Sequence, residues 1–155
     1  MLKKSILIFI FLITSSCGYE AMYSKTNSVD YNFSVSNINF DGDKDINLRI
    51  KQKFNNYFLS KKEKEFQLNI NSITEKVIVS KNSAGEAQIY ENTTTVYIDV
   101  YLESISKGTL EIKKGFKYNN NNNKFDLDTY EKDLKSNIAE TIADELIFKL
   151  SSIQW

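Results

Sequence analysis

The sequence predicts an α+β domain built as a two-layer sandwich. We expect a four-stranded, mixed and mostly antiparallel sheet with two helices on one face, in the order β-α-β-β-β-α. Apolar residues recur at helical spacing in two segments, one after residue 44 and one at the C-terminal end. Between them lie three segments in which apolar and polar residues alternate, and short connections join these segments as in an antiparallel meander.

The first strand and the first helix are predicted from residues 31–60. In YNFSVSNINF, apolar residues alternate imperfectly with Ser and Asn, which indicates a strand. DGDKD then breaks the strand and supplies acids that favour the start of a helix. The residues that follow at helical spacing are Ile46, Ile50, Phe54, Tyr57 and Phe58. We therefore expect a helix over about 44–60, followed by the charged link KKEKE at 61–65.

Three strands are predicted between residues 66 and 119. The first begins with alternation at Phe66, Leu68 and Ile70, and SAGEA around Gly85 makes a turn. Residues 88–103 place Val96, Ile98, Val100 and Leu102 on one face and Tyr97, Asp99, Tyr101 and Glu103 on the other. SKG at 106–108 is interpreted as the next turn. The intervening helix allows the first strand to pair in parallel with the meander. The opposite face, rich in Tyr, Thr, Asn and charge, is expected to be wetted or covered by a partner.

A long helix is predicted at the C-terminal end, after a polar loop at NNNNN (119–123). Asp128 with Glu131 three positions later resembles a capping box, so we place the helix start there. One side of the helix is apolar, with Ala139, Ala143 and Ile147 widening a stripe that contains Tyr130, Leu134, Ile138, Ile142, Leu146, Leu150 and Ile153. This width favours packing against a sheet over a coiled-coil seam.

The single cysteine, Cys17, lies directly behind a short apolar segment. A single cysteine cannot form an internal disulfide, so it is either a buried apolar residue, an intermolecular disulfide partner, a reactive thiol or an attachment point. Lys3 and Lys4, the apolar run 5–13 and small residues before Cys17 have the layout of a secretory signal. The segment resembles bacterial lipoprotein signals, which implies cleavage before Cys17 and its acylation, palmitate included. We therefore divide the chain into a signal peptide (1–16), a lipidated tether (17–30) and one α+β domain (31–155).

Composition argues against several function classes. The whole chain has 20 Lys and Arg against 20 Asp and Glu; without Lys3 and Lys4, 18 basic residues face 20 acidic ones, a charge of −2. So small a charge does not favour nucleic-acid binding. With no histidine and one cysteine, the commonest zinc ligands and general base are missing. We expect no catalytic residue, no metal site and no cofactor, although a carboxylate hydrolase stays open as a minor alternative.

Two segments resemble the lipopolysaccharide-assembly lipoproteins of the outer membrane, the LptE family. CGYEAMY at 17–23 is similar to the start of the mature family members, with Ala21 where they carry proline. DLKSNIAETIADELIFKLSSI is similar to their C-terminal helix, and the order of elements matches as well. Gly18 after the cysteine, in place of aspartate, favours the outer membrane facing the periplasm.

The resemblance implies a non-enzymatic role in lipopolysaccharide transport. Its members bind lipopolysaccharide and act as plug and folding partner of a large outer-membrane β-barrel, which places the glycolipid in the outer leaflet. The alternative is a periplasmic accessory lipoprotein of a lipid or solute transporter, or a secretin-type pilot lipoprotein. If glycolipid is bound, the preferred contacts are Lys113, Lys114 and Lys117 near Phe116 and Tyr118. A solvated lysine face that protects the sheet edge is the competing interpretation.

Overall fold

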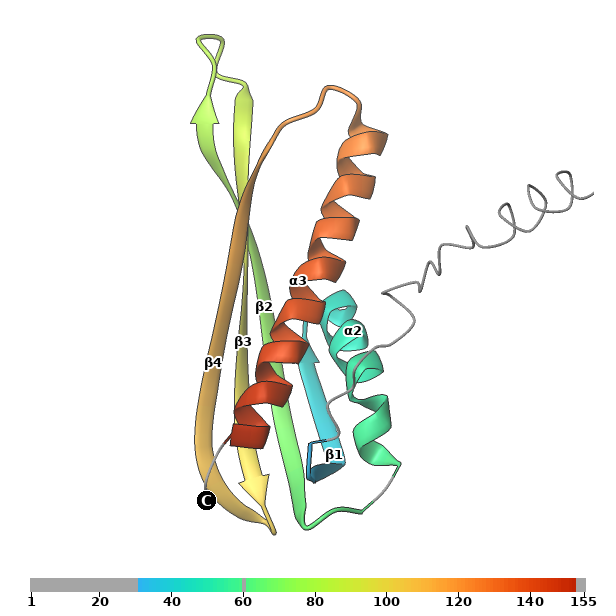
Figure 1. The fold of residues 1–155 in the computed structure, drawn as a ribbon. Coiled ribbons are helices and arrows are strands. Elements are labelled where there is room, and N and C mark those ends of the chain that lie inside the picture. Colours follow the sequence, from blue (N-terminus) through green and yellow to red (C-terminus); the bar gives the residue numbers. More distant parts are fainter. Residues whose placement is uncertain (1–30, 60, 153–155) are drawn as a thin grey trace, which may run out of the picture. The chain divides into compact units, whose positions relative to one another are not determined.

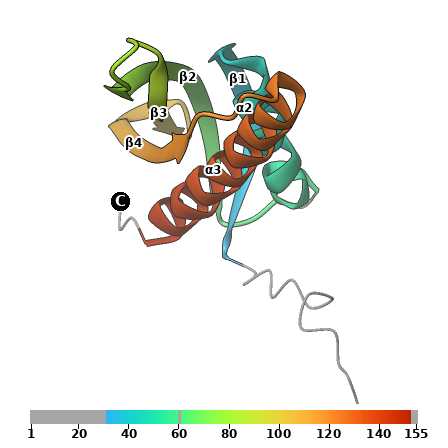
Figure 2. The same ribbon diagram turned by 90° about the horizontal axis from the view of Figure 1, so that it is seen from above.

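Four strands form one sheet in the order β1-β2-β3-β4, and two helices lie over it (Figures 1 and 2). The structure, a computed structural model, describes residues 31–59 and 61–152, so Cys17 and the predicted signal and tether lie outside the described residues. The elements are β1 (Phe33–Gly42), α2 (Lys44–Phe54), the 3-10 helix η1 (Asn55–Phe58), β2 (Lys64–Lys81), β3 (Ala87–Leu102), β4 (Ile105–Asn119) and α3 (Lys124–Ser152). β1 and β2 are parallel, and the other two pairs are antiparallel. The predicted fold class is confirmed.

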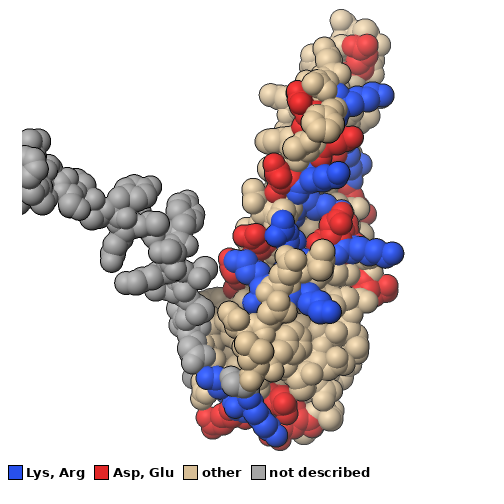
Figure 3. Space-filling model, turned by 90° about the vertical axis from the view of Figure 1, so that its right-hand side faces the viewer, with Lys and Arg blue, Asp and Glu red and all other residues tan. Residues whose placement is uncertain are grey.

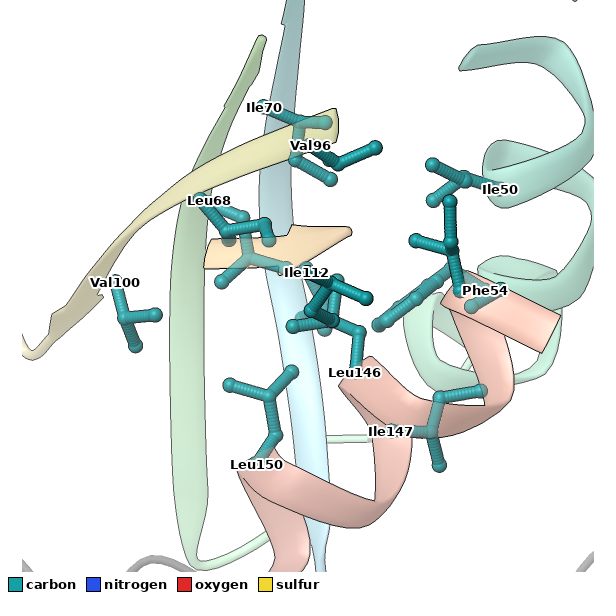
Figure 4. Packing of buried hydrophobic residues seen from close by; sticks show 14 of the residues in the cluster. Ile50, Phe54, Leu68, Ile70, Val96, Val100, Ile112, Leu146, Ile147 and Leu150 are labelled. Carbon is teal, nitrogen blue, oxygen red and sulfur yellow. The ribbon is translucent and has the colours of Figure 1, made fainter. Parts of the chain in front are cut away.

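The core lies between the helices and one face of the sheet (Figure 4). α2 contributes Ile50 and Phe54, and α3 contributes Leu146 and Leu150, all fully buried. They meet alternate residues of the strands, among them Phe66, Leu68, Ile70, Val96, Ile98, Val100 and Ile112. Burying a side chain of this size contributes about 1.5–3 kcal/mol, so this layer is the main source of stability.

β1 contains a bulge that explains its imperfect alternation. Its pairing with β2 runs from Val35 opposite Phe66 to Asn37 opposite Gln67, so Ser36 is an extra residue. The bulge shifts the side-chain period by one position. The apolar residues before it (33 and 35) and after it (38 and 40) therefore all face the helices, where they join the core or pack against it.

The first helix is shorter than the sequence predicts. α2 ends at Phe54, and Asn55–Phe58 form a 3-10 turn. Asparagine is a weak former of helix interiors, and helices often tighten into 3-10 geometry at their C-terminal end. The tighter turn leaves Phe58 39% exposed, while Tyr57 stacks on Phe33 with ring centroids 4.7 Å apart.

The predicted turn at 106–108 is wrong. Leu102 pairs with Ile105, so the hairpin turn consists of Glu103 and Ser104, both with positive φ (52° and 68°). Two positive φ values in a two-residue loop define a type I′ turn, which usually selects Asn-Gly. Gly108 (φ 115°) lies at the following bulge, where β4 has one residue more than β3 between paired positions. The glycine therefore marks a bulge and not a turn.

The start of α3 also differs from the prediction. The helix begins at Lys124, and the side chain of Asn123 accepts a hydrogen bond from Phe125 N (3.1 Å) and donates one to Asp126 (2.8 Å). The last asparagine of the NNNNN segment, Asn123, is therefore the N-cap, five residues before the predicted start at Asp128. Asn120 bonds the backbone of Gln88 and Ala87, so part of this segment also closes the end of the sheet.

Candidate functional site

The sheet face away from the helices, the open face, has no element packed on it among the described residues. It consists of every second residue of each strand, including Asn39, Asn69, Asn71, Thr95, Tyr97, Asp99, Tyr101, Glu111 and Lys113. Two cross-strand hydrogen bonds order it: Asn39 to Asn69 (2.9 Å) and Thr109 to Asp99 (2.6 Å). Tyr97 is 40% exposed. This face is polar, rich in hydrogen-bonding groups, and flanked by strand edges.

The three preferred lysines do not lie on one face. Neighbouring residues of a strand point to opposite faces, and Lys114 points to α3, where its amine lies 2.6 Å from Glu145. That hydrogen bond, stronger than the opposing effect of burial, holds the pKa of the Glu145 carboxyl below its usual value. Lys113 and Lys117 belong to the open face, and Lys117 lies 4.0 Å from Glu91. Only two of the three lysines therefore share the open face, and they lie four residues apart along β4.

A cluster that the sequence analysis missed connects α3 to the upper sheet, by which we mean the strands beyond Ser72 of β2 and Ile112 of β4, toward the top of Figure 1. The carboxylate of Glu131 accepts hydrogen bonds from Lys76 (2.6 Å) and from the hydroxyl of Tyr118 (2.7 Å). The Lys76 amine also lies 4.2 Å from the centre of the Tyr90 ring, close enough for a cation–π contact. Burial, and then Glu131, raise the pKa of the Tyr118 phenol. The phenol therefore stays protonated at neutral pH and serves as a donor.

A signal for this cluster is present in the sequence. The helix-facing positions of β2 are apolar up to Ile70, and the next three, Ser72, Thr74 and Lys76, are polar. β4 changes in the same way after Ile112. A core face that turns polar and aromatic partway along its strands indicates that the covering helix is held there by polar contacts.

A cleft of about 700 Å³ lies beside this cluster, between the upper sheet and the first turns of α3. Val79, Ile89 and Leu127 give it an apolar part, and Tyr118 and Tyr130 an aromatic one. Within the described ranges no group of His, Cys, Asp and Glu has the arrangement of a metal site. None of the helices in the same ranges combines the length and the apolarity that crossing a membrane requires.

Charge is mixed over the surface. On the face shown in Figure 3, Lys and Arg side chains alternate with Asp and Glu, and neither sign gathers into a large patch. Many charges among the described residues are paired, as in Lys53 with Asp144 (3.4 Å) and Lys135 with Asp43 (2.7 Å). A surface of this kind does not attract a polyanion by its overall field.

The fold is similar to those of several solved bacterial lipoproteins. Rare lipoprotein B from Shewanella oneidensis has a TM-score of 0.60 at 13% identity, covering 75% of this chain and 94% of its own. Lipoprotein B from Nitrosomonas europaea has a TM-score of 0.54 at 12% identity, covering 77% and 83%. The minor lipoprotein from Acinetobacter baumannii has a TM-score of 0.51 at 10% identity, covering 73% of this chain and 91% of its own. At these identities the likeness shows the fold.

No protein-family model matches the sequence, and no curated protein matches it.

Proposed function

We propose that the chain is an outer-membrane lipoprotein of lipopolysaccharide assembly, anchored by acyl chains on Cys17 and facing the periplasm. In this role it is the plug and folding partner of a large outer-membrane β-barrel that places lipopolysaccharide in the outer leaflet. The lipoprotein part is supported by the signal layout around Cys17 and by the lipoproteins that share the fold. The finer role is supported by the N-terminal and C-terminal segments that resemble the LptE family.

The observation that carries the proposal is the open face of the sheet. One face of the sheet buries the core under α2 and α3, while the other presents Thr95, Tyr97 and Asn71 without a covering element among the described residues. The lumen of an outer-membrane barrel is polar. A polar, hydrogen-bonding face with tyrosines suits such a wall, because Tyr contributes contact area and a polar group together.

Co-purification from the native host tests the role. Tagged full-length protein, extracted from membranes in mild detergent, is expected to retain a large β-barrel protein in equal amount, together with lipopolysaccharide. Retention of transporter subunits or of a secretin ring in place of that barrel would instead favour the accessory or pilot alternative. The double variant Thr95→Glu/Tyr97→Lys, whose new charges lie opposite Lys113 and Glu111, should lose the barrel and stay folded. Asn137→Lys, on the exposed side of α3, is the matched control and should retain it.

Lipid attachment is tested separately at Cys17. Mass spectrometry of the membrane-extracted protein is expected to give a chain that starts at Cys17 and carries acyl mass. Cys17→Ser should leave the precursor uncut or release the protein from the membrane, since multiple acyl chains provide the stable anchor. An intact Met1 terminus, or an unmodified thiol in the native host, would disprove this part of the proposal.

A further inference from the structure

One stretch of β2 is a strand edge with no neighbour among the described residues. β1 pairs with β2 only as far as Gly42 opposite Ser72. β2 continues to Lys81 and from there on pairs with β3 alone. Residues Ile73–Lys81, which we call the β2 free edge, form one side of the hairpin that extends above the rest of the sheet in Figure 1.

Backbone directions along the β2 free edge follow from one hydrogen bond. Asp43 N donates to the carbonyl of Ser72 at 3.0 Å, so the backbone groups of Ser72 point to the β1 side. Successive residues of a strand direct their N–H and C=O groups to opposite sides, and β2 is regular up to Ile78. Thr74, Lys76 and Ile78 therefore present their backbone donors and acceptors outward, where a further strand would bind them.

The side chains of the β2 free edge are unusually apolar for an unpaired strand. Ile73, Val77, Ile78 and Val79 are 44%, 52%, 49% and 43% exposed. Natural sheets protect such edges with charges, proline, bulges or a covering element. Within the regular stretch 73–78 the charged residues are Glu75 and Lys76, and Lys76 points to the helices, where Glu131 binds it. Glu75 has no ion pair within the described residues.

We propose that the β2 free edge binds an extended segment of another polypeptide as a fifth strand. Its backbone bonds Thr74, Lys76 and Ile78. On the open face, its aliphatic or β-branched side chains lie beside Ile73 and Val77, and a Lys or Arg lies beside Glu75. A second copy of this chain fits less well, because its own cation in the regular stretch, Lys76, faces the helices and is already bound. The proposal is independent of which membrane complex the protein serves.

A synthetic strand tests this with the full-length protein in detergent. The probe is the labelled peptide Thr-Val-Thr-Lys-Thr-Val-Thr, and its binding is followed by fluorescence anisotropy. Replacing its Lys by Glu should weaken binding about fivefold, the size expected when an exposed attraction becomes a repulsion. Glu75→Lys should reverse this preference. N-methylation of alternate peptide nitrogens should abolish binding, because a strand cannot pair without these donors.

Two further variants separate strand addition from loss of folding. Ile78→Pro removes an outward N–H, which an edge strand tolerates, and should weaken peptide binding at least about tenfold. Ile78→Thr keeps the N–H and should bind as the unchanged protein does. On binding, the amides of Thr74, Lys76 and Ile78 should gain protection from hydrogen exchange. No binding, binding insensitive to N-methylation, or an edge already occupied by a second copy in sedimentation would each overturn the proposal.

Discussion

Asp43 connects α2 and α3 through one side chain. It caps α2 by accepting hydrogen bonds from Asp45 N (3.0 Å) and Ile46 N (3.3 Å), and it binds Lys135 of α3 at 2.7 Å. Burial raises the pKa of the Asp43 carboxyl, but the hydrogen bonds from Lys135 and Ile46 lower it by more, so the pKa lies below its ordinary value of 3.8. Burial lowers the pKa of Lys135, but the hydrogen bond and the charge of Asp43, together with those of Asp45, raise it by more, so the net shift is upward.

The pH dependence of stability follows from these directions. Because the pKa of Asp43 is lower in the folded state, its contribution is complete above the ordinary value of 3.8 and is lost as the pH falls through the folded value. Asp43→Asn keeps a capping oxygen but no charge. Its free energy of unfolding, measured by urea denaturation, should therefore fall less steeply than that of the unchanged protein below about pH 4. Equal acid slopes would contradict the ion pair.

Gly42, next to Asp43, shows how a single residue determines an element boundary. It has φ 88°, and a side chain there would collide with the carbonyl of Ser72. A residue without Cβ adopts this conformation at no steric cost. The DGDKD segment thus ends β1 and starts α2 within a few residues, as the sequence predicts, and the structure adds that it brings the chain close to β2.

At the scale of elements, α3 has two halves that are held differently. Its fully buried side chains begin at Ala139, and its first half is held by Glu131, by Lys135 and by partly buried contacts. Both halves belong to one continuous helix over the sheet (Figure 2). The second half therefore determines global stability, and the first half determines whether the upper sheet stays covered.

The core half of α3 can be tested by truncation. Leu146→Ala and Leu150→Ala each remove a fully buried side chain and should each cost about 2–5 kcal/mol of unfolding free energy. Phe148→Ala lies between them but is 60% exposed, and it should change stability by less than about 1 kcal/mol. Thermal and urea unfolding measure both. Similar losses at all three positions would mean that the helix is packed in another orientation.

The first half of α3 can be tested by removing one charge. Glu131→Gln weakens the bonds to Lys76 and Tyr118, on the order of 1–2 kcal/mol for partly exposed, charge-assisted contacts. Hydrogen exchange should then accelerate over residues 124–134 with little change over 139–150. Asp133→Asn makes the same charge change at an exposed residue and should leave both regions as they are.

How far the sequence predicts this fold depends on the period of each element. Alternation and helical spacing identify all four strands and both helices, and the helix between β1 and β2 permits their parallel pairing. The errors lie at the ends of elements, because one hydrogen bond or one extra residue determines where a helix or a turn begins. Asn123 caps α3 five residues before Asp128, and Glu103–Ser104 form the turn that the sequence analysis places at 106–108. Propensity does not decide such local competitions.

At the scale of the whole molecule, the site is harder to predict than the fold. A lysine's face depends on strand register, and its charge depends on residues distant in sequence. Lys114 and Glu145 are 31 positions apart in sequence, yet their side chains meet at 2.6 Å. The same holds for Lys76 and Glu131, 55 positions apart. Composition predicts a nearly neutral protein, but only the packing of the helices on the sheet determines which lysines pair with carboxylates and which can bind a ligand.

Glycolipid binding, if it involves this region, should therefore depend on two of the three lysines. Lys113 and Lys117 lie on the open face of β4, an edge strand, with Lys117 4.0 Å from Glu91, whereas Lys114 faces α3 and lies 2.6 Å from Glu145. Lysine binds phosphate as a point charge, so the two should act together, most strongly at low salt. Binding of lipopolysaccharide by the full-length protein should weaken in Lys113→Gln/Lys117→Gln and in the triple variant with Lys114→Gln to the same extent.

The single variant Lys114→Gln separates binding from stability. Glu145 has a lowered pKa because Lys114 binds it, and its contribution to stability is present above the ordinary value of 4.5 and lost as the pH falls through the folded one. Lys114→Gln should therefore reduce the melting temperature near pH 7 more than near pH 3, while lipopolysaccharide binding stays unchanged. If instead Lys114→Gln alone abolished binding at low salt, the glycolipid would have to reach the helix-facing side of β4, and the open face would not be its site.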